Sequence, residues 1–165
     1  MTQAKPKDKA ALLARIRAAR GALEQALGRL DESALTHPGP DGWSIKDHLA
    51  HLSAWVRETT AVLRGQPGHT ALGLDAAVYN GGAEDAVNAA LQERSHPLPL
   101  AEVLADFRAT HTAILDYIDA ESEERLTQPF SPANPEDQRR VIDAIAGNTY
   151  EHDEEHWGWI EQRMK

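Results

Sequence analysis

The stretch GWSIKDHLAHLSAW, residues 42–55, carries the strongest structural signal in the sequence. Gly42 closes a segment dense in turn-forming residues, and Ser44 is a good N-cap for a helix that follows it. Asp47, three residues later, supplies a weaker form of the acid that completes a capping box. Apolar residues then recur at helical spacing, at Ile45, Leu49, Leu52, Val56 and Leu63. The pattern predicts an amphipathic helix that begins after Ser44 and ends near Gly65.

Three other long segments show the same helical periodicity. The first runs from about Lys7 to Leu30, and another covers Leu100 to about Ala120. The last is expected to start with Asn134 as N-cap and Pro135 at the first helical position, and to reach about Met164. Four long amphipathic helices bury their apolar stripes most simply against one another. The sequence therefore predicts an all-α fold, a four-helix bundle.

The segments between these helices predict little further structure. Residues 65–83 are expected to form a long loop, and loops of that length often lie over a functional site. A short helix is expected from Ala83 to Ser95, and nothing in the sequence is typical of a strand. A chain of 165 residues fits one domain, 1–165, in which residues 1–6 are expected to be a flexible tail.

Composition argues against several classes of partner. The chain has 17 Lys+Arg against 26 Asp+Glu, a net charge of −9 and a pI near 5.3, so neither nucleic acid nor an anionic membrane is expected to bind. No apolar run approaches the roughly 20 residues that span a bilayer, and no signal peptide is recognisable, so a cytoplasmic location is predicted. The absence of cysteine excludes disulfides, thiolate ligands and a cysteine nucleophile.

The last predicted helix carries a pair of histidines on its core side. At about 100° per residue, one stripe contains Val141, Ile145, Thr149, His152, His156, Ile160 and Arg163. His152 and His156 are one turn apart, a spacing that lets two imidazoles converge on one ion. The same periodicity places Asp153 and the neighbouring glutamates toward solvent. The alternative is that each histidine is a core residue satisfied by a hydrogen bond.

A third ligand is expected from another helix. His48 and His51 lie beside the Leu49/Leu52 stripe, and periodicity places His48 nearer its centre and His51 on its shoulder. His111, on the stripe of the 100–120 helix, is a further candidate ligand or a partner of the ligands. Periodicity alone leaves the choice open.

The stretch 42–55 resembles the second-helix signature of the DinB/YfiT-like superfamily, with a tryptophan at the helix start and a histidine eight positions later, here His51. That family's metal site takes this histidine and two from an HxxxH motif on the last helix, here His152 and His156. Within the superfamily the chain is most similar to the DfsB/ClbS-like branch, through Trp55 and the segments 91–104 and 148–152. Colibactin-protection members commonly lack the full triad, which this chain keeps, so a metal-bearing relative is favoured over a toxin cyclopropane hydrolase.

The resemblance implies a DinB/YfiT-like bundle, one divalent ion (zinc or nickel, with iron as an alternative) and a homodimer. It also implies metal-dependent transfer of a low-molecular-weight thiol to an electrophilic small molecule, a detoxifying reaction. Three neutral histidines leave a coordination position open, as in catalytic sites. There are two alternatives to this reaction. The first is hydrolysis by metal-activated water, with Glu58 or Glu155 as the base, although both are expected to face solvent. The second is non-catalytic sequestration of a metal or small molecule. The sequence identifies no catalytic residue.

Overall fold

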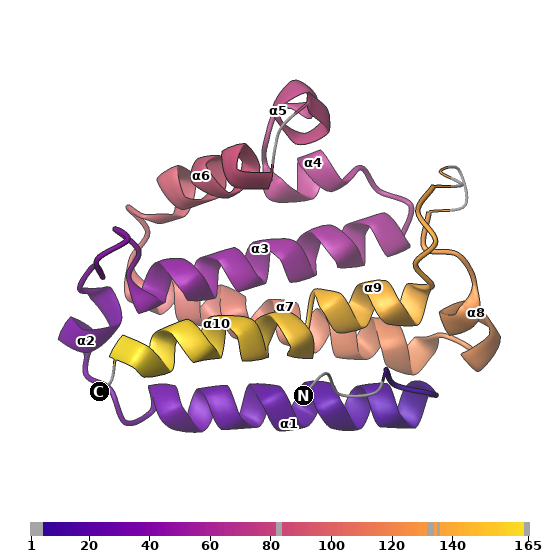
Figure 1. Cartoon of the computed structure of the whole chain (residues 1–165), viewed down its shortest axis with the longest axis horizontal. Coiled ribbons are helices and arrows are strands. Elements are labelled where there is room, and N and C mark those ends of the chain that lie inside the picture. Colours follow the sequence, from indigo (N-terminus) through magenta and orange to yellow (C-terminus); the bar gives the residue numbers. More distant parts are fainter. Residues whose placement is uncertain (1–4, 82–83, 132–133, 135, 164–165) are drawn as a thin grey trace.

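A computed structural model describes residues 5–81, 84–131, 134 and 136–163. Its frame is a bundle of four helical rods, α1 (Lys9–Leu27), α3 (Ile45–Leu63), α7 (Leu100–Ala120) and a broken fourth rod formed by α9 (Val141–Gly147) and α10 (Tyr150–Arg163) (Figure 1). Between the described residues there is no strand, only an isolated bridge that joins Pro129 to Arg140. The predicted all-α bundle is confirmed.

The start of α3 follows from the capping box that the sequence predicts. The Ser44 hydroxyl accepts a hydrogen bond from the Asp47 backbone N–H at 3.1 Å, and the Asp47 carboxylate accepts one from the Ser44 backbone N–H at 2.8 Å. Two orphan donors of the first turn are thereby satisfied. At the other end Gly65 has φ +76°, the left-handed conformation that glycine adopts at low cost.

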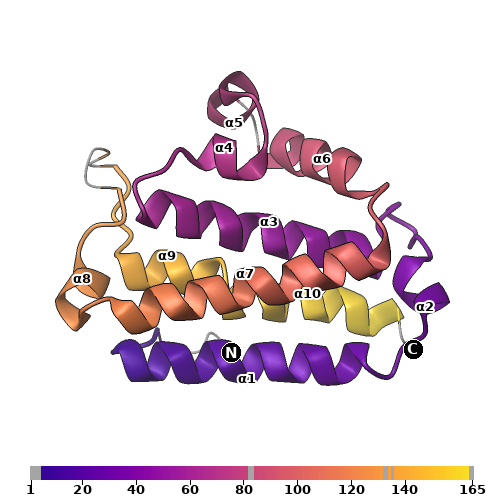
Figure 2. The same ribbon diagram turned by 180° about the vertical axis from the view of Figure 1, so that it is seen from behind.

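The other two unbroken rods also match their predicted ranges closely. Helix α7 has the predicted bounds, whereas α1 is shorter than the predicted 7–30 segment. Asp8 caps α1 by accepting a hydrogen bond from the Ala11 N–H at 2.8 Å, and Gly28 is its C-cap. Seen from behind, α7 crosses the bundle beside α3, with which it packs along much of its length (Figure 2).

The core lies between the rods in two apolar clusters. The first joins α1, α3, α7 and α9, and the second joins α1, α3, α7 and α10 near the other end of the bundle. Their fully buried members include Leu12, Ile16, Ile118, Ile142, Ile145, Leu23, Leu49, Leu52, Phe107 and Ile160. Burying each such side chain contributes about 1.5–3 kcal/mol, so these stripes hold the rods together.

The prediction for the start of the last helix is wrong. Asn134 lies outside any helix, and Pro135 and Met164 lie outside the described residues. Helix α9 begins only at Val141, because the preceding chain pairs with residues 128–130: the Phe130 N–H donates to the Arg139 carbonyl at 2.8 Å, and the Val141 N–H to the Gln128 carbonyl at 2.9 Å. Backbone groups used in this way are not available to an earlier helical turn.

The last helix is also interrupted between α9 and α10. The break falls at Asn148 and Thr149, directly after Gly147, a residue with low helix propensity. The Thr149 hydroxyl donates to the Ile145 carbonyl at 2.6 Å, a bond to the preceding turn that commonly bends helices. The predicted single rod is therefore two helices in sequence.

The long loop predicted at 65–83 contains helices where it is described. Helices α4 (Gly68–Leu72) and α5 (Ala76–Gly81) precede α6 (Glu84–Ser95), which confirms the predicted short helix over its described residues. Leu72, Val87 and Leu91 pack as a third apolar cluster against Ala54 of α3. This burial explains why the segment folds over the bundle and does not form an irregular loop (Figure 1).

The remaining short helices are α2 (Glu32–Thr36) and α8 (Glu123–Thr127), which connect the rods. Of the tail expected at residues 1–6, residues 1–4 lie outside the described part of the chain. Pro6 is buried, and the Lys5 ammonium lies 3.6 Å from the Asp143 carboxylate. None of the described helices is long and apolar enough to cross a membrane.

Candidate metal centre

Three histidines meet where α10 lies against α3. One ring nitrogen from each of His51, His152 and His156 lies within 4.8 Å of the others, and the Nε2 atoms of His51 and His152 are 3.2 Å apart. The His51 and His156 rings are stacked with centroids 4.8 Å apart, and those of His152 and His156 are 4.7 Å apart. The structure thus brings together the three residues that the family resemblance selected.

The arrangement follows from helical spacing. His152 and His156 are four residues apart on α10, so their side chains lie one above the other on the same face. That face meets α3, on which His51 is 6 % exposed. The predicted inward orientation of the pair agrees with this packing.

His48 lies next to this cluster. Its Nδ1 is 2.9 Å from the Nδ1 of His156, and its side chain is 3 % exposed, so it is the more deeply buried of the two α3 histidines. Periodicity was therefore right about burial, while His51 is the residue that joins the three-nitrogen cluster. Among the described residues, His111 does not join this cluster; burial lowers its pKa to about 4, and the nearby Arg20 and Arg17 add to the shift.

Burial keeps the three imidazoles neutral at physiological pH. It lowers the pKa of His51 to about 3, with the nearby His152 and His48 adding to the shift. Burial likewise lowers the pKa of His152 to about 4 and that of His156 to about 2, the latter with help from the neighbouring histidines. A neutral imidazole has a lone pair for a metal, so the protonation state suits coordination.

The donor set fits a divalent ion. Two nitrogens bound at 2.0–2.1 Å to one tetrahedral ion lie about 3.4 Å apart, close to the 3.2 Å between the Nε2 atoms of His51 and His152. The Nδ1 atoms of both residues are buried and have no hydrogen-bond partner among the described residues. The facing Nε2 atoms are close enough to share an ion, and the three histidines can hold one.

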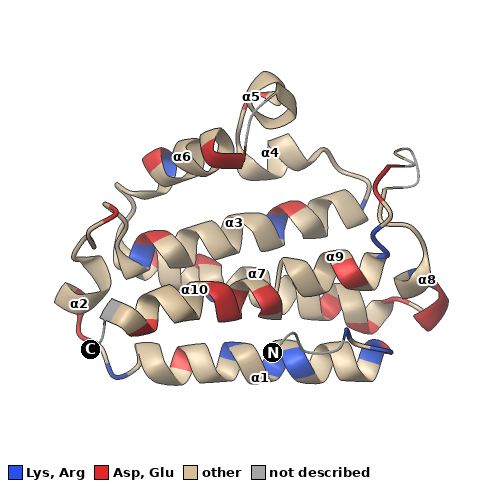
Figure 3. Ribbon diagram, in the orientation of Figure 1, with Lys and Arg blue, Asp and Glu red and all other residues tan. Residues whose placement is uncertain are grey.

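Asp153 does not face solvent, contrary to the sequence prediction. Its side chain is buried, with 2 % exposure, and accepts hydrogen bonds from Arg20 Nε at 3.2 Å and Nη2 at 3.5 Å. Arg20 is buried too; its Nη1 donates to the Phe107 carbonyl, and its guanidinium lies 3.6 Å from the Phe107 ring centroid. Figure 3 shows basic segments of α1 alongside acidic segments of α10. The pair fixes α10 against α1.

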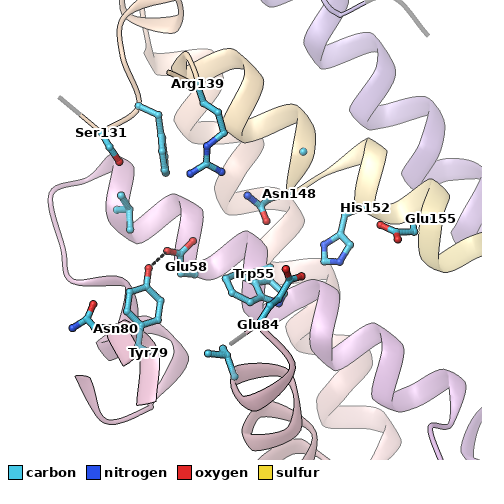
Figure 4. A pocket seen from close by; sticks show the side chains of 14 residues that line it. Trp55, Glu58, Tyr79, Asn80, Glu84, Ser131, Arg139, Asn148, His152 and Glu155 are labelled. Carbon is cyan, nitrogen blue, oxygen red and sulfur yellow. Dashed lines mark hydrogen bonds between the residues drawn. The ribbon is translucent and has the colours of Figure 1, made fainter. Parts of the chain in front are cut away.

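Two cavities meet at the cluster. One of about 700 Å³ is lined by residues that include Trp55, Glu58, Tyr79, Arg139 and His152 (Figure 4). The other, about 450 Å³, is lined by the three clustered histidines, by His48 and by the aromatic side chains of Trp43 and Trp159. His152, Glu84 and Glu155 line both cavities. A small molecule in either cavity would therefore lie beside His152.

The two glutamates considered as bases differ in environment. Glu58, expected to face solvent, is 7 % exposed and accepts a hydrogen bond from the Tyr79 hydroxyl. Periodicity failed here because the α4–α5 segment covers this side of α3. The sequence predicted a loop for that segment and so gave no sign that it would bury Glu58. Glu155 is exposed, as expected.

Comparison with known proteins gives one family. A family model described as the DinB superfamily matches residues 15–160. A solved structure from Streptococcus pneumoniae superposes with a TM-score of 0.77 at 17 % identity, covering 98 % of this chain and 92 % of that one. An uncharacterised protein from Escherichia coli UTI89 gives 0.70 at 16 % identity, covering 96 % and 93 %. At these identities the two structures show the fold alone. No curated protein sequence matches the chain.

Proposed function

Since the chain belongs to the DinB superfamily, we propose that it is a metal-dependent enzyme whose divalent ion is held by His51, His152 and His156. One observation carries the proposal: three neutral imidazoles converge within 4.8 Å at the junction of two cavities. Three protein ligands leave a coordination position open for a reactant. Imidazole ligands suit zinc and nickel, with iron as an alternative.

The reaction that we propose is transfer of a low-molecular-weight thiol to an electrophilic small molecule. A divalent ion bound by the histidines would favour the thiolate form of the incoming thiol. The chain supplies two cavities that share His152, so two reactants can approach the same point from different sides. The absence of cysteine is compatible with this chemistry, because the thiol arrives with the cosubstrate.

Metal-dependent hydrolysis is the second candidate, and the burial of Glu58 favours it. Glu58 is buried in the wall of the larger cavity, which His152 also lines, so a base at this position would face the same cavity as an ion held by the histidines. Glu155 is the less suitable base because it is exposed.

The first test is elemental analysis of the protein purified without an affinity tag. We expect about one divalent ion per chain; no ion, and no uptake by the metal-free protein, would refute the metal centre. The metal-loaded protein is then incubated with monochlorobimane and a panel of thiols. Thiol consumption that is lost in His51→Ala and kept in His37→Ala, an exposed histidine outside the cluster, supports transfer.

The same assay separates the alternatives. Consumption of the electrophile without any thiol indicates hydrolysis, and tight ligand binding without turnover indicates sequestration. Two finer expectations stay proposals, namely membership of the DfsB/ClbS-like branch and a homodimer. Light scattering coupled to size exclusion measures the oligomeric state.

A further inference from the structure

The wall of the larger cavity carries a buried acid that the metal centre does not use. Figure 4 shows Glu58 and Tyr79 on one side of the cavity and His152 on another. Glu58 projects from α3 and Tyr79 from α5, so the covering segment and the bundle both contribute to this wall. A volume of about 700 Å³ lies within the range of small-molecule sites.

The Glu58 carboxylate is only partly satisfied. Its described donors are the Tyr79 hydroxyl on Oε1 and the adjacent Thr59 hydroxyl, at 3.3 Å, on Oε2. A carboxylate offers about four lone-pair positions, so roughly half of its capacity is unused. Glu58 also forms no ion pair with another described residue. A buried carboxylate is costly unless it is paired, so this one is poised for a cationic partner.

The chain holds this acid in a fixed position. Gly68 at the start of α4 permits the contact, because a Cβ there would lie 2.4 Å from the Tyr79 hydroxyl and 2.7 Å from Glu58 Oε1. Burial and the hydrogen bond to Glu58 raise the pKa of Tyr79, so its phenol stays protonated and donates. Such an orienting donor is typical of a preorganised binding group.

The other lining residues favour a cation. Among the described ones, Glu84 and Glu155 add two carboxylates, and Arg139 is the one lysine or arginine. Two nitrogens of Arg139, Nε and Nη2, donate to Asp137 at 2.9 and 2.8 Å, and the Arg139 charge also acts on Glu58 from a distance, without forming an ion pair with it. Trp55 adds an aromatic wall, whose indole N–H donates to Asn88. A carboxylate beside an aromatic ring is a favourable environment for an organic ammonium group.

We propose that this cavity binds a small molecule that carries an ammonium group, with Glu58 as its anchor and Trp55 as its aromatic wall. Tyr79 is a positioning residue that holds the carboxylate. The inference rests on the proposed function for one point only, that the other end of the same ligand reacts beside His152. The ammonium site itself requires no metal.

The test uses two probes of matched shape, 2-phenylethylamine and 2-phenylethanol, and the full-length protein. Binding is measured by titration calorimetry and by NMR chemical-shift perturbation at pH 7, where the amine is charged. Since a hydrogen bond to a charged group contributes about 1.5–3 kcal/mol, the wild type is expected to prefer the amine by roughly 10- to 100-fold.

Two isosteric variants locate the anchor. Glu58→Gln is expected to remove the preference for the amine, whereas Glu93→Gln, which changes an exposed carboxylate of α6 that does not line this cavity, should keep it. Equal affinity of the wild type for both probes, or an undiminished preference in Glu58→Gln, overturns the proposal. If Glu58→Gln does not fold, intermolecular NOEs from the amine to Trp55 and Tyr79 in the wild type decide, and their absence overturns it.

The outcome is separable from that of the proposed function. Repeating the titration with His51→Ala, which is expected to lack the ion, tests the ammonium site alone, and the preference should persist. Elemental analysis and thiol consumption test the metal chemistry alone. An enzyme that turns over thiols but does not discriminate between the probes refutes only the ammonium site; a discriminating protein without an ion refutes only the metal centre.

Discussion

Replacing the two histidines of α3 separately should distinguish a metal ligand from its neighbour. His51→Ala removes one of the three proposed ligands and should abolish retained metal. His48→Ala leaves all three but removes the ring 2.9 Å from the Nδ1 of His156. Losing a partner that orients a metal-bound histidine typically weakens binding 10- to 100-fold. His37→Ala, on the exposed surface, is the matched control.

The expected magnitudes follow from mass action. At a free metal concentration 100 times the wild-type dissociation constant, the ion adds about 2.7 kcal/mol to the free energy of unfolding. With binding weakened 10- to 100-fold, the same concentration adds only about 1.4 to 0.4 kcal/mol in His48→Ala. The contribution should fall to about zero in His51→Ala and stay near 2.7 kcal/mol in His37→Ala.

Urea unfolding of each variant with and without metal measures this contribution. The difference between the two curves cancels any change that the substitution makes to the metal-free protein. If His48→Ala strips the metal and His51→Ala keeps it, periodicity was the better guide and the assignment of His51 is wrong. Equal losses in the two variants would instead show that both histidines act as ligands.

Three further outcomes are expected. Chelating the ion should lower the melting temperature by about 5–10 °C under the same metal conditions, as measured by scanning calorimetry; an unchanged curve after confirmed removal contradicts this. Arg20→Met or Asp153→Leu alone should lower the free energy of unfolding by about 3–5 kcal/mol, because each leaves an unpaired buried charge, and the double variant should lose less. Urea unfolding measures these losses, and a loss below about 1 kcal/mol in either single variant would contradict the role of the buried pair. Gly68→Ala should destabilise by about 1–3 kcal/mol, since its Cβ would lie 2.4 Å from the Tyr79 hydroxyl, whereas Gly21→Ala, with no atom within 4 Å, should be neutral or stabilising; equal melting temperatures for these two variants would show that the close contact at α4 carries no strain.

Local signals predicted the parts of the fold that local interactions determine. The capping box at Ser44 and Asp47 involves neighbours in the sequence, and it placed the start of α3 correctly. The start of α9 could not be found in this way, because residues 128–130 occupy the backbone groups before Val141. A helix N-cap pattern competes with such pairing, and only the tertiary structure shows which of them prevails.

Periodicity predicted the histidine pair and failed for acids whose partners come from elsewhere. Asp153 is next to His152 in sequence, and a rotation of about 100° turns it toward α1, where Arg20 pairs with it. Periodicity assigns an acid on that side of α10 to solvent, because the sequence does not show that a buried arginine of α1 lies opposite it. Glu58 failed for a related reason, since Tyr79 reaches it from a segment expected to be a loop.

Both misassigned acids explain how the site is built. Since Asp153 is held by Arg20, α10 has a fixed rotation about its axis, and that rotation directs His152 and His156 toward α3. Since Glu58 is held by Tyr79, the α4–α5 segment is tied to α3 and closes one wall of the larger cavity. The apolar stripes determine which helices pack together, whereas these two polar contacts determine which side chains face the cavity. Substitutions at Arg20 or Tyr79 therefore act on the site through geometry, without contact with the three clustered histidines.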